Sequence, residues 1–99
     1  RWLSEADQAA KAGSFDDAVR LVWLGVLASQ DLAGAVHASP GRTNGEHRRS
    51  WHGSATDLVT FVRVADRVDR LRYGGVRADQ ASWSSLRAEC SPLLQEARS

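Results

Sequence analysis

Residues 16–32, DDAVRLVWLGVLASQDL, contain the longest apolar stretch of the chain, which runs over residues 21–28. On a helix, the apolar side chains of this segment would cover more than half of the circumference rather than a single stripe. Such a helix is usually central to a bundle and covered by its neighbours. Asp16 is expected to cap the helix at its start, and Gly34 is expected to end it just beyond Leu32. The segment therefore predicts a central helix around which the rest of the chain packs.

Capping residues and glycines predict further helices on both sides of this one. A first helix is expected to open at Ser4, where a hydroxyl precedes acidic residues, and to stop at Gly13. A short helix is expected to open with the capping-box pattern TNGE at residues 43–46 and to end near residues 51–53. These segments therefore predict two more helices, one before the central helix and one after it.

The second half of the chain carries the pattern of two more helices. One opens at Thr56 and ends at the glycine pair of residues 74 and 75. The other opens at about Asp79, and Pro92, which lacks a backbone donor, is expected to kink it or end it early. No segment of the sequence shows the strict apolar alternation of a half-buried strand. The expected fold class is therefore all-α, a compact bundle of about five helices.

The apolar faces of these helices identify the expected core. Trp23 and Trp83 lie on such faces, where packing in the core is the ordinary interpretation. Cys90 is the one cysteine, so it cannot form a disulfide within the chain, and it shares an apolar stripe with Trp83 and Leu86. We therefore expect a buried, inert thiol rather than a catalytic nucleophile.

Length and charge exclude several classes of protein. Ninety-nine residues with a mass of 10.8 kDa form one small domain, residues 1–99, with a single hydrophobic core. Thirteen basic and twelve acidic residues nearly cancel, so the bulk attraction to nucleic acid or to an anionic membrane is missing. Twelve of the basic residues are arginines, an imbalance that we attribute to coding bias rather than to phosphate binding. No nucleic-acid partner is expected.

The sequence has no methionine and begins with Arg1, which leads us to expect that it is part of a longer protein. Its longest apolar stretch, residues 21–28, is far shorter than the roughly 20 residues that a transmembrane helix needs. Any membrane anchor is therefore expected in an upstream segment of the parent protein.

Groups for catalysis or metal binding are not assembled in the sequence. His47 and His52 are five residues apart and miss the spacing with which two histidines on one helix bind zinc. Asp16 and Asp17 lie at a helix start, where the helix dipole favours the charged carboxylate over the protonated form of a general acid. We therefore expect no enzyme, no cofactor and no metal ion.

One segment combines basic and aromatic side chains. Trp51 lies among His47, Arg48, Arg49 and His52. A patch of this kind can bind an acidic partner, a lipid headgroup or, by stacking, a single-stranded nucleic acid. A solvated helix face without a partner is the alternative interpretation.

Residues 9–19, AAKAGSFDDAV, resemble the turn of a tetratricopeptide-type (TPR-like) helical hairpin. In that pattern a small-residue helix ends at glycine, an aromatic residue follows two positions later, and an alanine in the next helix allows close approach. The unit does not repeat in residues 37–99, so we expect one hairpin-like element inside a bundle.

A wider resemblance covers nearly the whole chain. Its elements, in order, are Trp2, the turn at residues 13–18, Arg42-Thr43-Asn44-x-Glu46, Phe61, Tyr73-Gly74-Gly75 and Asp79. With these motifs the chain resembles the bacterial C-terminal domain family called domain of unknown function 4129 (DUF4129). The resemblance implies a helical module at the C-terminal end of membrane proteins, including transglutaminase-like ones, often encoded beside MoxR-type AAA ATPases. It attaches no catalytic role to these motifs; Gly74 would supply the left-handed residue at a helix end.

We therefore expect a non-catalytic protein-interaction module, the C-terminal domain of a membrane-anchored protein, on the cytoplasmic side. Its candidate contact residues are Arg42, Arg48, Arg49, Trp51 and Tyr73, since arginine and aromatic residues are enriched at interface hot spots. The resemblance implies a protein partner, either a MoxR-type ATPase or a cell-envelope protein, and we expect a monomer or a weak dimer. The alternative is a structural or regulatory cap of a parent enzyme, without an external partner.

Overall fold

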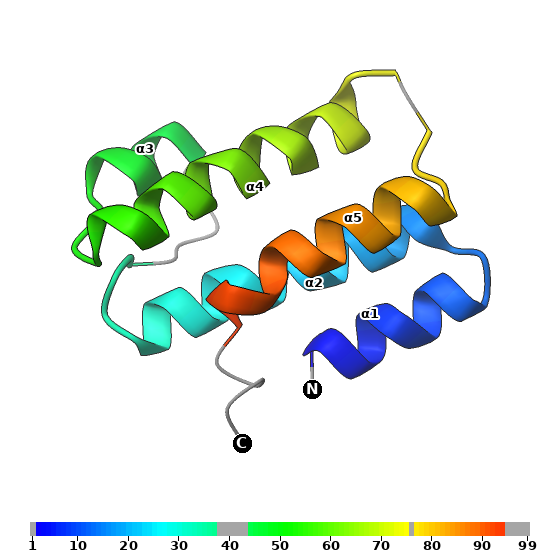
Figure 1. Ribbon diagram of the computed structural model, residues 1–99, viewed down its shortest axis with the longest axis horizontal. Coiled ribbons are helices and arrows are strands. Elements are labelled where there is room, and N and C mark those ends of the chain that lie inside the picture. The colour runs from blue at the N-terminus through cyan, green and yellow to red at the C-terminus, as the bar shows by residue number, and fades with distance from the viewer. Residues whose placement is uncertain (1, 38–43, 76, 95–99) are drawn as a thin grey trace.

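A computed structural model of the chain describes residues 2–37, 44–75 and 77–94, and Figure 1 shows their arrangement. These residues form five α-helices and one 3₁₀ turn, and no strand. In chain order the elements are α1 (Trp2–Lys11), α2 (Phe15–Leu32), α3 (Asn44–Arg49), α4 (Ala55–Tyr73), α5 (Gln80–Cys90) and the 3₁₀ turn η1 (Ser91–Leu93). The predicted all-α bundle of about five helices is therefore confirmed. Among the described helices, none combines the length and the apolar character needed to cross a membrane.

The predicted central helix is α2. It packs against α1, α4 and α5, which are the other long helices of the bundle. In Figure 1, α2 and α4 run antiparallel, so the start of α2 lies at the same end of the molecule as the end of α4. The short helix α3 lies beside the first half of α4. The two ends of α4 therefore have different neighbours: α3 lies beside its first half, and the start of α2 lies at the same end of the molecule as its last residues.

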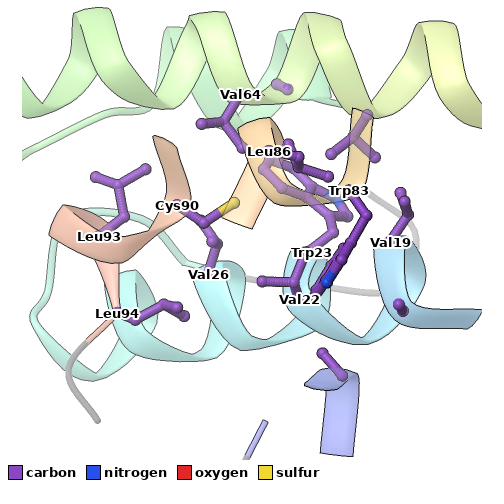
Figure 2. Close-up of a cluster of buried hydrophobic side chains, with 14 of the residues drawn as sticks. Val19, Val22, Trp23, Val26, Val64, Trp83, Leu86, Cys90, Leu93 and Leu94 are labelled. Carbon is purple, nitrogen blue, oxygen red and sulfur yellow. The ribbon is translucent and has the colours of Figure 1, made fainter. Parts of the chain in front are cut away.

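The core lies between the four long helices, and Figure 2 shows part of it. Trp23 and Trp83 are both buried there, as their positions on apolar faces predicted. The largest side chains with almost no exposed surface are Phe61, Leu86, Leu93, Leu94 and His47. The Gln30 Nε2 group donates a hydrogen bond to the Leu93 carbonyl oxygen at 2.8 Å, which ties η1 to α2 inside the core.

The hairpin of α1 and α2 is closed by local hydrogen bonds. Gly13 takes a left-handed conformation with φ of +81°, which favours glycine because it has no Cβ. The Ser14 N–H then donates to the Ala9 carbonyl oxygen at 2.9 Å, and the Gly13 N–H donates to that of Ala10 at 3.0 Å. Further along, a Cβ on Gly25 would lie 2.5 Å from the Trp2 Cβ, so this glycine permits the close approach of α1. The predicted ends at Gly13 and Gly34 are confirmed, since Gly34 also has a positive φ of +80°.

Two predicted helix starts are wrong by two residues each. α1 begins at Trp2, so Ser4 lies within the helix and does not cap it. The cap of α2 is Ser14 rather than Asp16, because the Ser14 carbonyl oxygen already accepts the first helical hydrogen bond, from the Ala18 N–H at 3.0 Å. Asp16 lies in the first turn, where its charge complements the helix dipole.

The boundaries of α4 also differ slightly from the prediction. Ser54 rather than Thr56 caps the helix, and its side chain accepts a hydrogen bond from the Asp57 N–H at 3.1 Å. At the other end Gly74 has φ of −86°, and its N–H still donates to the Arg70 carbonyl oxygen at 3.0 Å. The left-handed residue is Gly75, with φ of +76°, so the assignment of this role to Gly74 is wrong by one residue.

The start of α5 is as predicted, and of the two outcomes expected at Pro92, a kink or an early end, the structure shows the early end. Asp79 caps the helix in a capping box with Ser82, whose backbone N–H donates to the Asp79 Oδ1 at 2.8 Å. The helix ends at Cys90, and Pro92 lies in the 3₁₀ turn that follows. The capping box predicted at Thr43 lies outside the described residues.

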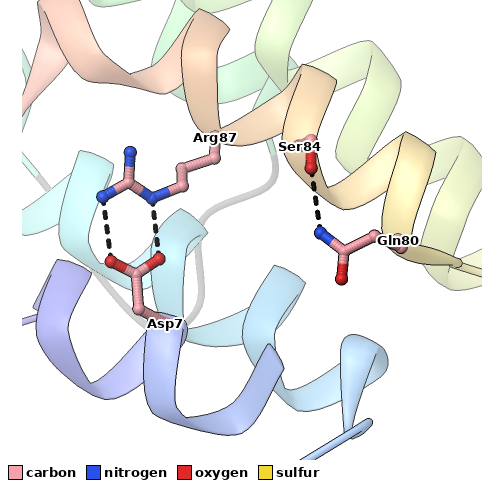
Figure 3. Close-up of polar contacts among 4 residues, drawn as sticks. All are labelled: Asp7, Gln80, Ser84 and Arg87. Atoms are coloured by element: carbon pink, nitrogen blue, oxygen red, sulfur yellow. Dashed lines mark hydrogen bonds and ion pairs between the residues drawn. The ribbon is translucent and has the colours of Figure 1, made fainter. Parts of the chain in front are cut away.

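Two ion pairs hold α5 against its neighbours. The Arg87 guanidinium donates to the Asp7 carboxylate twice, with Nε–Oδ1 at 2.7 Å and Nη2–Oδ2 at 2.8 Å, which joins α5 to α1 (Figure 3). This hydrogen bond raises the pKa of Arg87 above its usual value. The Arg67 Nη1 lies 2.8 Å from the Glu89 Oε1 and joins α4 to α5. Both pairs are partly exposed to solvent, so they orient the helices more than they stabilise the fold.

Candidate functional site

The structure splits the predicted basic patch around Trp51. Arg48 and Arg49 lie in the last turn of α3 with exposed side chains, and His52 is exposed as well. His47, between them in sequence, is only 2% exposed and belongs to the interior. We refer to Arg48, Arg49 and Trp51 as the α3 surface.

Trp51 is partly buried and fixed on both sides of its ring. Its Nε1–H donates a hydrogen bond to the Ser54 carbonyl oxygen at 3.0 Å. Its ring centroid lies 5.0 Å from that of Phe61, at an interplanar angle of 36°. Behind it, the His52 N–H donates to the Ala35 carbonyl oxygen at 2.7 Å, which ties this segment to the residues that follow α2. Trp51 is therefore held in place rather than free to stack.

A small pocket of about 110 Å³ lies beside the α3 surface, between α3 and α4. Its lining is Gly45, Arg48, Phe61, Val62, Ala65, Asp66 and Asp69. The lining combines apolar side chains with charges of both signs. Arg48 thus lines the same hollow as two acidic side chains of α4, Asp66 and Asp69.

Tyr73 lies far from the α3 surface. Its side chain is 73% exposed, and the Arg72 guanidinium carbon lies 5.2 Å from its ring centroid. Because a helix rises by about 1.5 Å per residue, Tyr73 is roughly 18 Å along α4 from Phe61, which contacts Trp51. Arg42, the remaining candidate contact, lies outside the described residues. The predicted contact residues therefore do not form one continuous patch.

A larger cleft lies at the Tyr73 end of the molecule, between the start of α2 and the end of α4. Its volume is about 470 Å³, and its lining is Asp16, Asp17, Arg20, Leu71, Arg72, Gly75 and Arg77. A second hollow of about 370 Å³ shares Asp16, Asp17 and Arg77 with it and reaches the α1–α2 turn. We call the larger hollow the arginine cleft, because three arginines line it.

The arginine cleft was not predicted from the sequence. Arg20 and Arg72 are 52 positions apart, and only the antiparallel packing of α2 and α4 brings them to one hollow. The signal present in the sequence was the excess of arginine, which we attributed to coding bias. Arg72 and Arg77 also bracket the glycine turn after α4, a position from which both can face one site.

Cys90 is fully buried, as its position on the apolar stripe predicted. Burial, together with a smaller effect of the neighbouring charge of Glu89, raises the pKa of its thiol to about 12. The thiol therefore stays protonated at neutral pH and is shielded from substrates. Within the described residues, no group of three or more His, Cys, Asp or Glu side chains is placed to hold a metal ion.

In comparisons with known proteins, the chain matches no family model, no curated protein and no solved structure. The resemblance to domain of unknown function 4129 therefore stays a prediction that rests on the sequence motifs alone.

Proposed function

We propose that the chain is a non-catalytic protein-interaction module that uses the α3 surface to bind another protein. In the parent protein it would be the C-terminal domain of a membrane-anchored chain, on the cytoplasmic side, as the resemblance to domain of unknown function 4129 implies. A MoxR-type ATPase or a cell-envelope protein is the expected class of partner. Tyr73 and Arg42 remain candidate contacts, with Tyr73 part of a separate area.

The observation that supports this proposal most directly is the fixed position of Trp51 beside two exposed arginines. The Ser54 hydrogen bond and the Phe61 ring hold Trp51 in one orientation before any partner arrives. A fixed contact residue loses little conformational freedom on binding, which favours affinity. Tryptophan and arginine are also the residue types most enriched at interface hot spots.

The experiment that tests the proposal begins with capture of partner proteins by the immobilised domain from a lysate of its own cells. The captured protein is then purified, and its affinity for the domain is measured by calorimetry. Replacing both exposed arginines, Arg48→Ala with Arg49→Ala, should weaken binding by about tenfold or more, as expected for hot-spot side chains. Since both side chains are exposed, the variant should keep the fold.

The matched control is Arg63→Ala with Arg70→Ala, which removes the same charge from exposed positions of α4 outside the α3 surface. It should bind like the native domain. Equal binding by all three proteins would remove the α3 surface from the proposal. The variant Trp51→Phe keeps an aromatic ring and tests the indole N–H separately.

The alternative function, a cap on the parent enzyme, has one observation in its favour. Leu32 is 80% exposed and Leu24 is 37% exposed, and both belong to α2. Exposed leucines on a central helix are suited to contact with another part of the parent chain. Hydrogen exchange would test this, because the amides at residues 24–32 should exchange more slowly in the full-length protein than in the separate domain. Equal exchange in the two proteins would contradict the cap.

A further inference from the structure

The arginine cleft gathers positive charge in a concave part of the surface. Arg20, Arg72 and Arg77 all line it with exposed side chains. Two aspartates, Asp16 and Asp17, line the same hollow, so the formal charge of its lining is +1. Both aspartates lie in the first turn of α2, where the positive end of the helix dipole partly offsets their charge. The cleft as a whole therefore attracts a ligand with negative charge.

The arginines of the cleft are more available to a ligand than the two arginines that pair with carboxylates inside the fold. Arg87 and Arg67 hold carboxylates at 2.7 and 2.8 Å within the fold. In the cleft, the Arg20 Nη2 lies 3.9 Å from the Asp17 Oδ1, which is a weak and exposed contact. Within the described part of the chain, Arg77 is in no ion pair, and Arg72 contacts the Tyr73 ring rather than a carboxylate. At least two guanidinium groups, those of Arg72 and Arg77, can thus donate hydrogen bonds to a ligand.

The composition of the cleft points to carboxylates on a peptide as the ligand. A guanidinium group matches the planar geometry of a carboxylate and can donate two parallel hydrogen bonds to it. A densely charged polyanion would be repelled by Asp16 and Asp17, whereas a peptide can present an isolated carboxylate and also donate backbone N–H groups to these aspartates. Leu71 adds an apolar wall for an aliphatic neighbour, and the open shape of the cleft suits an extended segment.

We propose that the arginine cleft binds a short acidic segment of a protein partner, with Arg72 and Arg77 holding its side-chain carboxylates. This inference rests on the proposed function in one respect only, that the partner is a protein. It adds the chemistry of the recognised segment and a second contact area, at the opposite end of α4 from the α3 surface.

The test is a titration of the ¹⁵N-labelled domain, followed by amide chemical shifts, with a blocked hexapeptide of sequence GELELG. A second peptide, GQLQLG, has the same shape without the charges. The titrations are run at low ionic strength, because about 0.1 M salt already screens exposed charges beyond roughly 10 Å. The acidic peptide should give saturable shifts at residues 16–20 and 71–77, and the neutral peptide should give none.

The variant Arg72→Gln with Arg77→Gln should bind the acidic peptide about fivefold more weakly, the change expected when two exposed ion pairs are lost together. The control Arg63→Gln with Arg70→Gln has the same net charge and should bind like the native domain. Unfolding curves of both variants show whether the fold is retained. We expect that it is, because all four side chains are exposed.

Three results would overturn the inference. They are equal shifts with the neutral peptide, equal affinity for both double variants, and shifts that appear at α3 instead of the cleft. A parallel titration with inorganic phosphate tests a different ligand. If phosphate bound more tightly than the peptide and shifted the same amides, the cleft would be a phosphate site and the proposal of an acidic peptide would be contradicted.

The inference and the proposed function fail separately. Partner capture that depends on Arg48 and Arg49, with no peptide binding in the cleft, would leave the proposed function intact and remove the acidic segment. Peptide binding in the cleft, with no effect of the α3 variants on partner capture, would keep the acidic segment and remove the α3 surface from the proposed function.

Discussion

The α1–α2 hairpin and the α3 segment, residues 44–53, are ordered by different kinds of contact. The hairpin is closed by Gly13 and by hydrogen bonds between residues that are neighbours along the chain. The α3 segment contains a helix of six residues, and helices shorter than about 12 residues are marginal in isolation. Its order comes from distant residues, namely Phe61 under Trp51 and the Ala35 carbonyl that binds the His52 N–H. The proposed contact surface therefore depends on contacts with distant residues, whereas the turn of the hairpin is closed by its own residues.

The largest expected effect is that of Phe61→Ala, which breaks the contact between the two regions. The Phe61 ring is fully buried and lies 5.4 Å from Trp23 of α2 and 5.0 Å from Trp51, centroid to centroid. Removing a buried phenylalanine ring should lower the free energy of unfolding by about 3–5 kcal/mol, measured by urea denaturation. The control Val59→Ala, at an exposed position of α4, should change it by less than about 0.5 kcal/mol. Similar effects of the two changes would contradict the role of Phe61.

A change in the hairpin should have the next largest effect. In Gly25→Val the new side chain would collide with Trp2, since the first added carbon already lies 2.5 Å from the Trp2 Cβ. Overpacking of this kind should lower the free energy of unfolding by about 1–3 kcal/mol. Ala28→Val places the same side chain on the exposed face of α2 and should cost well under about 1 kcal/mol. If both variants lost equal stability, a collision with Trp2 would not be the cause of the loss in Gly25→Val.

A smaller and more local effect is expected for Trp51→Phe. The ring remains on Phe61, but the hydrogen bond from the indole N–H to the Ser54 carbonyl is lost. This partly exposed bond should contribute about 0.5 kcal/mol. Hydrogen exchange should become faster in the α3 segment and stay unchanged in the α1–α2 hairpin. Faster exchange in both regions would show that they are coupled more tightly than the contacts suggest.

The smallest effect concerns α5, whose start is ordered locally, like the hairpin. The Ser82 backbone N–H donates to the Asp79 Oδ1, and the Ser82 hydroxyl donates to the Asp79 carbonyl oxygen. Hydrogen bonding by the backbone and then the side chain of Ser82 lowers the pKa of the Asp79 carboxyl below the usual 3.8. The folded state therefore releases this proton more easily than the unfolded state. The cap should be fully effective above pH 3.8 and should weaken as the pH falls through the lowered pKa. The variant Asp79→Asn keeps an oxygen that accepts the hydrogen bond but has no carboxyl group to titrate. Its acid unfolding, followed by circular dichroism, should therefore lack this contribution. The same acid unfolding profile in the native protein and the variant would contradict the effect of Asp79.

The parts of the fold that sequence analysis predicted well are those governed by local rules. The apolar circumference of α2, the glycines at positions 13 and 34, and the cap at Asp79 all act within a few residues. The error at the start of α2 arose because neighbouring polar residues compete for the same role, as Ser14 does with Asp16. Such competition is decided by backbone geometry, which the sequence pattern alone does not contain.

The candidate site was harder to predict, because it depends on packing between distant segments. Burial of His47 and the anchoring of Trp51 both follow from the contact of the α3 segment with α4. Tyr73 and Trp51 are far apart because the length of α4 separates two motifs that were grouped as one set of contacts. Arg72 lies near the start of α2 only because of the way the helices pack, which the sequence pattern does not show.

The buried Cys90 provides a chemical probe for opening of the core. Its thiol has no exposed surface and a pKa of about 12, so an alkylating reagent at neutral pH can reach it only after α5 has moved away from α2 and α4. Opening of the α3 segment alone would leave Cys90 protected. The rate of alkylation, read by mass spectrometry on the intact chain, therefore reports movement of α5 away from the core and is insensitive to local motion at the proposed contact surface.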